Sequence, residues 1–221
     1  MTAAAIAIAS VGIVGLGAAF LRDQRQEKSR RHDLLAGCRG ALEGELLQHD
    51  HAGYPSLTGS YAGHRAELRL VVDMIQLRKL PVLWLQATLH RPVAIGGVLS
   101  LMKRASNTEF FSPHGELDHH MRPPPGFPPE LSLKASDKAA AEDWAARLAD
   151  PALEFFAEDR AKELLMTPKG VRLTWRVAET ERGHYLTTRL ARFERAEIDR
   201  AGAQALLARA ADLAELGEGV A

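Results

Sequence analysis

The clearest feature of the hydrophobic pattern is an uncharged segment at the start of the chain. Residues 2–21 contain no charged side chain. As a helix this segment spans about 30 Å, the thickness of the hydrocarbon core of a bilayer. Its large apolar residues favour insertion by roughly 2–5 kcal/mol, and its glycines, serine and threonine reduce that gain. The pattern therefore predicts a transmembrane anchor over residues 1–21.

Basic residues follow this segment directly. Because Lys and Arg beside a membrane span stay on the cytoplasmic side, we expect the chain beyond residue 22 to face the cytoplasm. Residues 22–32 then form a juxtamembrane flank that also contacts anionic lipid headgroups. A cleaved signal peptide and a buried helix of a soluble protein are the alternatives, but the segment lacks the positively charged start of a signal peptide. The basic residues of the flank are Arg22, Arg25, Lys28, Arg30 and Arg31.

The residue composition indicates a bacterial source. Arginine is far commoner than lysine and alanine is abundant, as in proteins from GC-rich genomes. The predicted location is therefore the bacterial inner (cytoplasmic) membrane, with the C-terminal domain in the cytoplasm. The expected partners are the membrane itself and a protein of unknown identity.

The first half of the remaining chain predicts one helix and then strands. Apolar residues recur at helical spacing from residue 34 to about residue 48, and Cys38 falls on that apolar stripe as a small buried hydrophobe. Apolar and polar residues then alternate over 65–74, and further strands are expected at 82–90 and 98–102. A long Pro- and His-rich loop, residues 105–130, follows, and a short strand resumes at 131–133.

The second half predicts two helices, a hairpin and a final helix. Asp137 is a good N-cap for the first helix, and Asp150-Pro151 marks the start of the second, which extends to about residue 165. The hairpin is expected over 171–193, and Asp199 caps an alanine-rich last helix. Strands in runs and helices in runs predict an α+β fold with a mainly antiparallel sheet packed by helices. The expected domain covers residues 33–216, with 217–221 as a tail.

The balance of charge and the cysteine content exclude several classes of function. The 28 Lys and Arg residues balance 28 Asp and Glu residues, so no basic excess favours nucleic acid. One cysteine excludes an internal disulfide and any zinc site made of cysteines. The chain also lacks a phosphate-binding loop, a His-Glu-x-x-His pair and a Gly-x-Ser-x-Gly elbow.

Histidines are the residues with suggestive placement. His49 and His51 lie two residues apart, and the long loop adds further donors for zinc or a similar ion at His114, His119 and His120. Histidines and acids are also common in solvated loops, so these five residues are candidates for a metal site and not an assigned one. No catalytic residue or cofactor is predicted.

The absence of a reactive constellation and the expected anchor together favour a non-catalytic binding or assembly module that faces the cytoplasm. Two alternatives remain open. One is a metal-dependent enzyme that uses the loop histidines. The other is a domain that binds a lipid or another apolar ligand beside the membrane.

Overall fold

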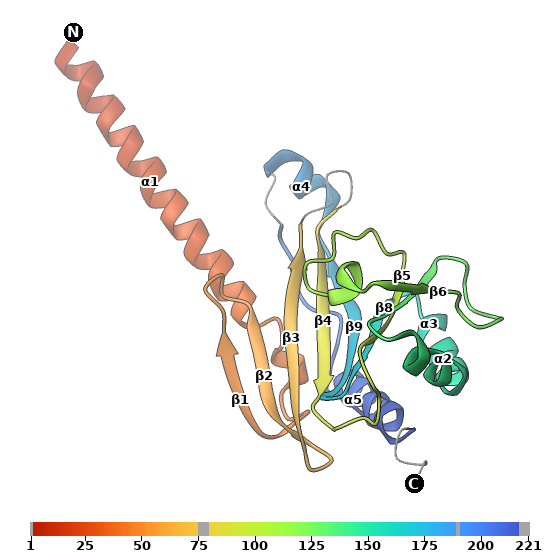
Figure 1. The fold of residues 1–221 in the computed structure, drawn as a ribbon. Helices are drawn as coiled ribbons and strands as arrows, with labels where there is room; N and C mark the ends of the chain where they lie inside the picture. The colour runs from red at the N-terminus through yellow and green to blue at the C-terminus, as the bar shows by residue number, and fades with distance from the viewer. Residues whose placement is uncertain (1, 75–79, 189–190, 217–221) are drawn as a thin grey trace.

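The computed structural model describes residues 2–74, 80–188 and 191–216. Within these residues one antiparallel sheet of nine strands forms the body of the molecule, in the order β1-β2-β3-β4-β9-β8-β5-β7-β6 (Figure 1). The strands are β1 (Glu43–His49), β2 (Pro55–Tyr61), β3 (His64–Asp73), β4 (Val82–Leu89), β5 (Leu99–Lys103), β6 (His119–Met121), β7 (Leu131–Ala135), β8 (Ala161–Thr167) and β9 (Gly170–Glu179).

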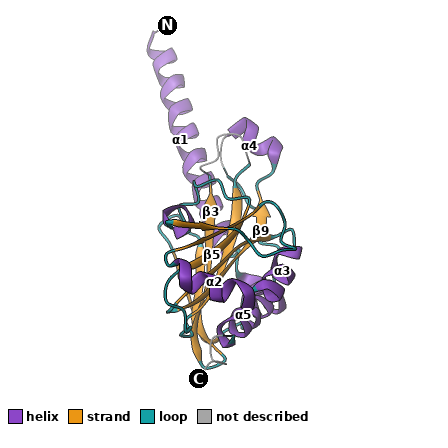
Figure 2. Cartoon of the chain, turned by 45° about the vertical axis from the view of Figure 1, so that its right-hand side comes forward, coloured by secondary structure: helices purple, strands orange, loops and turns teal. Residues whose placement is uncertain are grey.

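The longer helices lie around this sheet. In Figure 1, α5 lies behind β4 and β9, α2 and α3 lie beside β5 and β8, and α1 extends well beyond the end of the sheet. Figure 2 shows α2, α3 and α5 gathered on the same side of the molecule. The helices are α1 (Thr2–His32), α2 (Lys138–Arg147), α3 (Ala149–Ala157), α4 (Arg182–Thr188) and α5 (Arg200–Glu215), with short 3-10 turns η1 (Ala36–Cys38) and η2 (Pro113–Glu116).

The face of the sheet that meets the helices is apolar. Strand register places one unbroken row of buried residues across six strands. Because opposed residues of antiparallel strands share a face, all six side chains enter the same core. Burial of each leucine contributes about 1.5–3 kcal/mol, which fixes the register of the strands. The row is Leu68, Ala87, Leu173, Leu164, Leu101 and Leu133.

Cys38 is part of this core, as predicted. It is fully buried in η1, and its sulfur lies 3.8 Å from the carbonyl oxygen of Asp199. Burial, with the nearby carboxylates of Asp199 and Glu45, raises the pKa of the Cys38 thiol to about 11. The thiol is therefore a protonated core group and not a nucleophile.

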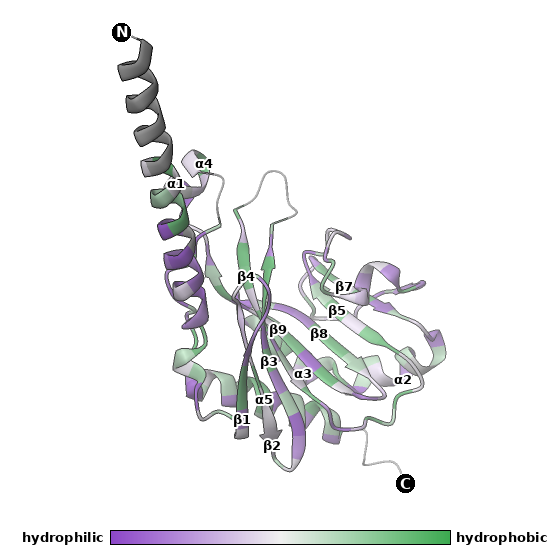
Figure 3. Cartoon of the chain, turned by 90° about the vertical axis from the view of Figure 1, so that its left-hand side faces the viewer, coloured by the Kyte–Doolittle hydropathy of each residue, from purple (hydrophilic) through white to green (hydrophobic). Residues whose placement is uncertain are grey.

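The prediction of a membrane anchor is wrong. Of the helices in the described part of the chain, not one has both the length and the apolar character that crossing a bilayer requires. From Gly15 onward, where the side chains of α1 are described, large apolar residues are confined to Leu16, Phe20 and Leu21. The helix then becomes hydrophilic up to its end at His32 (Figure 3).

This finding corrects three related expectations: the transmembrane part of the fold class, the single-pass membrane class and the inner-membrane location. The second half of α1, expected to face lipid headgroups, contacts the sheet domain. Arg31 donates to the carbonyl oxygen of Ala52 and lies 5.1 Å from the ring centroid of Tyr54. Glu27 forms an ion pair with Arg192 at 3.2 Å.

The helix expected up to residue 48 is also wrong. α1 ends at His32, the η1 turn follows, and residues 43–49 form the edge strand β1. Gly40 and Gly44 have φ angles of 78° and 59°, which L side chains adopt reluctantly and which a continuous helix excludes. The buried residues that suggested a helical stripe instead pack in the compact turn before β1.

Two further elements differ from the predictions. The helix expected to reach residue 165 ends at Ala157, and residues 161–167 form β8. β8 is buried on both faces, so its sequence lacks the alternation that identifies a strand. β9 pairs with β8, and the expected second strand of the hairpin contains the helix α4. The predicted tail, 217–221, lies outside the described residues.

Most of the other predicted elements are confirmed. β3, β4, β5 and β7 lie where strands were expected, and α2 follows Asp137. Asp199 caps α5 as predicted, with its carboxylate accepting from the Gly202 amide at 2.8 Å. The long loop contains two short elements of its own, η2 and β6.

Candidate functional site

The second face of the sheet carries a band of polar side chains. One row across the strands consists of Arg69, Gln86, Thr174, Glu163, Met102 and Ser132. The neighbouring row consists of Glu67, Thr88, Arg172, Leu165, Ser100 and Lys134. We call these two rows together the polar face.

The loop between β5 and β6 covers the middle of the polar face. In Figure 1 this loop, which carries η2, crosses in front of β4 and β9. Gln86 donates from Nε2 to the carbonyl oxygen of Phe111 at 3.2 Å, and Ser112 donates to Glu163. The loop is thus attached to two different strands.

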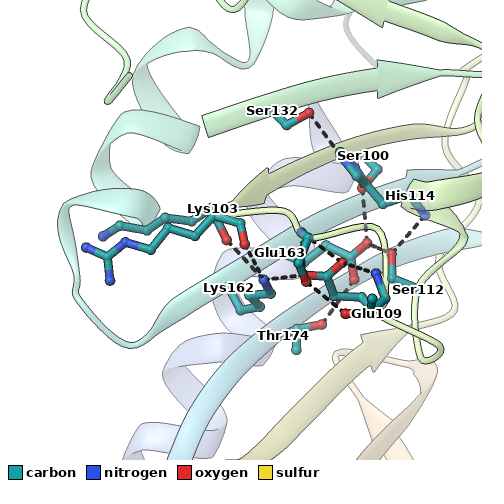
Figure 4. Close-up of polar contacts among 12 residues, drawn as sticks. Ser100, Lys103, Glu109, Ser112, His114, Ser132, Lys162, Glu163 and Thr174 are labelled. Carbon is teal, nitrogen blue, oxygen red and sulfur yellow. Dashed lines mark hydrogen bonds and ion pairs between the residues drawn. The ribbon is translucent and has the colours of Figure 1, made fainter. Parts of the chain in front are cut away.

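Glu163 is the centre of the buried contacts. Its side chain is fully buried and accepts four hydrogen bonds from side chains around it (Figure 4). A buried carboxylate is stable only where such donors replace its hydration. The donors are Ser100 at 3.0 Å, Ser112, Arg172 at 3.1 Å and Thr174 at 3.3 Å.

A β-bulge turns the neighbouring lysine onto the same face. Ala161 pairs with Trp175 and Glu163 pairs with Thr174, so Lys162 is an extra residue in β8. A bulge re-aims a side chain in this way because it breaks the alternation of the strand. Lys162 and Glu163 can therefore both lie beneath the loop, although they are adjacent in sequence.

Lys162 and Glu109 form a second buried ion pair. The two charged atoms, Lys162 Nζ and Glu109 Oε1, are 2.9 Å apart. Lys162 also donates to the carbonyl oxygens of Lys103 and Arg104, each at 3.1 Å, so all three of its protons are used. Burial alone raises the pKa of Glu109, but the bond and charge of Lys162, with bonds from Ser106, lower that pKa to about 2.

His114 is buried in the same network and is neutral. Burial, with the positive charge of Lys134 next in size, lowers the pKa of His114 to about 4. Its Nδ1 lies 2.9 Å from the Ser100 hydroxyl oxygen, and its Nε2 lies 3.1 Å from that of Ser132. Because Ser100 donates to Glu163, the His114 Nδ1–H donates to Ser100, and Nε2 accepts from Ser132.

This arrangement is not a nucleophilic triad. In a triad the acid orients the histidine, and the histidine then takes the proton of the serine. Here Glu163 bonds to Ser100 itself, and His114 donates to Ser100 instead of accepting from it. Ser100 is also fully buried, so a substrate cannot reach its hydroxyl. The chemistry of this network is to fix the loop on the sheet.

Beside the loop, an open part of the polar face forms a pocket of about 320 Å³. That volume is at the lower end of the range for small-molecule sites. Two nitrogens in its wall, His90 Nε2 and Arg172 Nε, are buried and have no hydrogen-bond partner among the described residues. The polar side chains that line this pocket include Arg69, Gln86, Thr88, His90, Lys169 and Arg172.

The five candidate histidines do not come together. His49 stacks on His32 at a centroid distance of 4.0 Å, at the end of β1, and His51 is exposed in the turn that follows. His119 and His120 are exposed on the edge strand β6, whereas His114 is buried. Across the described ranges, no three His, Cys, Asp or Glu side chains are grouped so that they could hold a metal ion.

Among the residues of the buried network, only His114 was predicted from the sequence as a site candidate. Lys162 and Glu163 lay inside the helix that was expected to reach residue 165, where they would be ordinary exposed charges. Arg69 was recognised as an outward-facing strand residue, but one strand does not reveal which polar neighbours share its face. A signal was available in β8, where a Lys-Glu pair interrupts an otherwise apolar run.

Over the residues that the structure describes, the fold is α+β with a single nine-stranded sheet, one apolar face under helices and one polar face partly under a loop. No protein-family model matches the chain, and no curated protein matches it.

Proposed function

We propose that the protein acts as a non-catalytic binding module, and that the pocket on the polar face is where it binds a small polar ligand. The observation that carries this proposal is the pair of buried, unpartnered nitrogens, His90 Nε2 and Arg172 Nε. A buried donor without an acceptor costs about 1–3 kcal/mol. A ligand oxygen that enters the pocket and accepts from such a donor recovers that energy.

The network beside the pocket supports binding rather than catalysis. Lys162 has no proton left for a substrate, and Glu163 accepts four bonds in a fully buried setting. Both side chains lie under the loop with all their hydrogen bonds made, so their role is to stabilise the local structure. Since Glu163 bonds to Arg172, the network holds one wall of the pocket in place.

The test uses the full chain and a small-molecule extract of bacterial cells. The protein is titrated with the extract while its backbone amide signals are followed by NMR, and the extract is analysed by mass spectrometry before and after incubation. We expect the shifts to centre on Thr88, Gly170 and Arg172, and we expect the composition of the extract to stay unchanged.

Two results would contradict the proposal. Shifts confined to other parts of the protein, or no shifts at all, would remove the pocket as the binding site. Conversion of an extract component that depends on the protein would remove the non-catalytic assignment. Arg69→Ala should weaken the response because Arg69 lines the pocket, whereas Lys138→Ala on α2 should leave it unchanged.

A further inference from the structure

The charges around the pocket define the class of ligand. We infer that the pocket binds a small organic oxyanion, that is, a molecule with a carboxylate or phosphate group attached to a neutral polar part. This inference rests on the proposed binding function and deepens it. Three features of the pocket support it: the unused donors, the balance of charge and the distribution of polar groups.

The unused donors lie at one end of the pocket, near the last residues of β4 and β8 and the first residues of β9. His90 follows β4, and Lys169 lies in the turn between β8 and β9. The close approach of Gly170 to this end of β4 brings the two segments together: a Cβ added at Gly170 would lie 3.0 Å from His90 Cα. Arg172 follows two residues later on β9.

Three kinds of donor therefore converge on this end. His90 and Arg172 line the pocket, and His90 Nε2, a donor in its Nε2–H tautomer, and Arg172 Nε are buried without partners among the described residues. Lys169 is exposed, and its ammonium group has no hydrogen bond or ion pair with any described residue. An oxyanion with two or three acceptor oxygens can satisfy all of them at once.

The charge balance favours an anion over a cation. Arg172 is neutralised by Glu163, and Glu67 opposes Arg69, which lies two residues away on the same strand face. The charge of Lys169 is then left in excess. A cationic ligand would meet this excess positive charge, and the one carboxylate that lines the pocket, Glu67, is already opposed by Arg69.

Along β4, neutral polar groups of the pocket lie among charged ones, since Gln86 is opposite Arg69 and Thr88 is opposite Glu67. Gln86 and Thr88 supply amide and hydroxyl groups, and Gln86 already donates to the loop at Phe111. Such groups suit neutral polar substituents of a ligand, such as hydroxyls or amides. The pocket therefore combines an oxyanion end, formed by Lys169, His90 and Arg172, with neutral polar groups at Gln86 and Thr88, of which Thr88 lies directly opposite Arg172.

The test uses two simple anions as probes of the oxyanion end, inorganic phosphate and acetate. Each is titrated separately into the full chain at constant ionic strength, maintained with sodium chloride, while amide signals are followed by NMR. We expect saturable shifts of Gly170, Val171 and Arg172 with at least one probe. Tighter binding of phosphate would indicate a phosphate ester as the natural ligand, and tighter binding of acetate would indicate a carboxylate.

Lys169→Gln is the informative variant, because this side chain is exposed and has no partner whose loss would disturb folding. It should raise the dissociation constant about tenfold, the effect of losing one hydrogen bond to an ionised group. Lys138→Gln, which removes an exposed lysine on α2, is the matched control and should leave the dissociation constant unchanged.

The inference is overturned if neither probe shifts these signals, or if both lysine variants weaken binding equally, which would indicate nonspecific attraction. Its failure differs from a failure of the proposed function. If an extract component binds the pocket while both anions fail, the binding function stands and the ligand class is wrong. If the extract leaves the pocket signals unchanged as well, both proposals fail.

Discussion

At the scale of single residues, the stability of this protein depends on whether buried charges keep their partners. Glu163 accepts from Ser100, Ser112, Arg172 and Thr174, so the surrounding groups have adapted to a full negative charge. In Glu163→Gln the amide nitrogen would face groups that are themselves donors, and the partly buried guanidinium of Arg172 would lose its counter-charge. We expect a loss of about 3 kcal/mol in the free energy of unfolding, measured by urea denaturation.

The matched control for that prediction is Glu67→Gln. Glu67 lies on the same face of the sheet, and its carboxylate has no hydrogen bond or ion pair with any described residue. The control should change stability by no more than about 0.5 kcal/mol. Equal effects of the two substitutions would show that the buried contacts of Glu163 contribute little.

The second prediction concerns the effect of His114 on the pH dependence of stability. Burial and the charge of Lys134 lower its pKa from an ordinary 6.5 to about 4 in the folded protein. The unfolded chain therefore binds a proton more readily, and the stability present above pH 6.5 is lost as pH falls from 6.5 towards 4. The loss attributable to His114 is about 3 kcal/mol.

This pH effect is measured as a difference between variants, because several carboxylates titrate in the same range. Urea denaturation of the wild type and of His114→Gln is compared from pH 7 down to about 4. The stability advantage of the wild type should shrink over this range. His120→Gln, at an exposed position on β6, should follow the wild type; a constant difference between the wild type and His114→Gln would contradict the prediction.

At the scale of elements, the loop between β5 and β6 is held by the bulge in β8. Lys162 bonds to Glu109 and to two backbone carbonyl oxygens, at Lys103 and Arg104, and so connects β8 to the start of the loop. Lys162→Met keeps much of the side-chain volume but leaves Glu109 buried without its cation. The loop should then open more readily, by about 3 kcal/mol, or roughly a hundredfold in amide exchange.

Hydrogen exchange measured by mass spectrometry on peptides from residues 104–112 tests this prediction. Lys169→Met, in the exposed turn between β8 and β9, is the control and should leave exchange in these peptides unchanged. Unaltered exchange in Lys162→Met would mean that the contacts of Gln86, Ser112 and His114 are sufficient to hold the loop.

The element scale also shows why some of the fold could be predicted from sequence and some could not. β3 is exposed on one side, so its alternation is visible, and Asp199 marks the start of α5 through local capping chemistry. β8 is covered on both sides and carries a bulge, so its pattern indicates neither a strand nor a face. The polar face depends on register across six strands, which no single segment encodes.

The error over α1 has a similar cause. A run of uncharged residues specifies a helix but does not specify its surroundings. The contacts of Arg31 and Glu27 with the domain depend on residues 52, 54 and 192, which are distant in sequence. The candidate histidines illustrate the same point, because His49 ends the edge strand β1 whereas His114 is buried in η2, which spacing along the chain does not reveal.

At the scale of the whole molecule, one sheet and one apolar core connect all the strands. The core row runs without a break from β3 to β7, and α5 packs on β4 and β9 in its centre. A protein with a continuous core of this kind should unfold in one cooperative transition, since losing any central strand exposes the core of its neighbours. The three tryptophans report on different regions: Trp84 on β4, Trp144 on α2 and Trp175 on β9.

We therefore expect thermal unfolding followed by tryptophan fluorescence to coincide with unfolding followed by far-ultraviolet circular dichroism. Variants that keep only Trp84 or only Trp144, with the other tryptophans replaced by Phe, should each retain a single transition at the midpoint of their own circular dichroism curve. If the Trp144 variant melted earlier by fluorescence than by circular dichroism, α2 and the strands it covers would be a separate unit. The continuity of the core row argues against that outcome, because Leu164, Leu101 and Leu133 lie in the same row as the central strands.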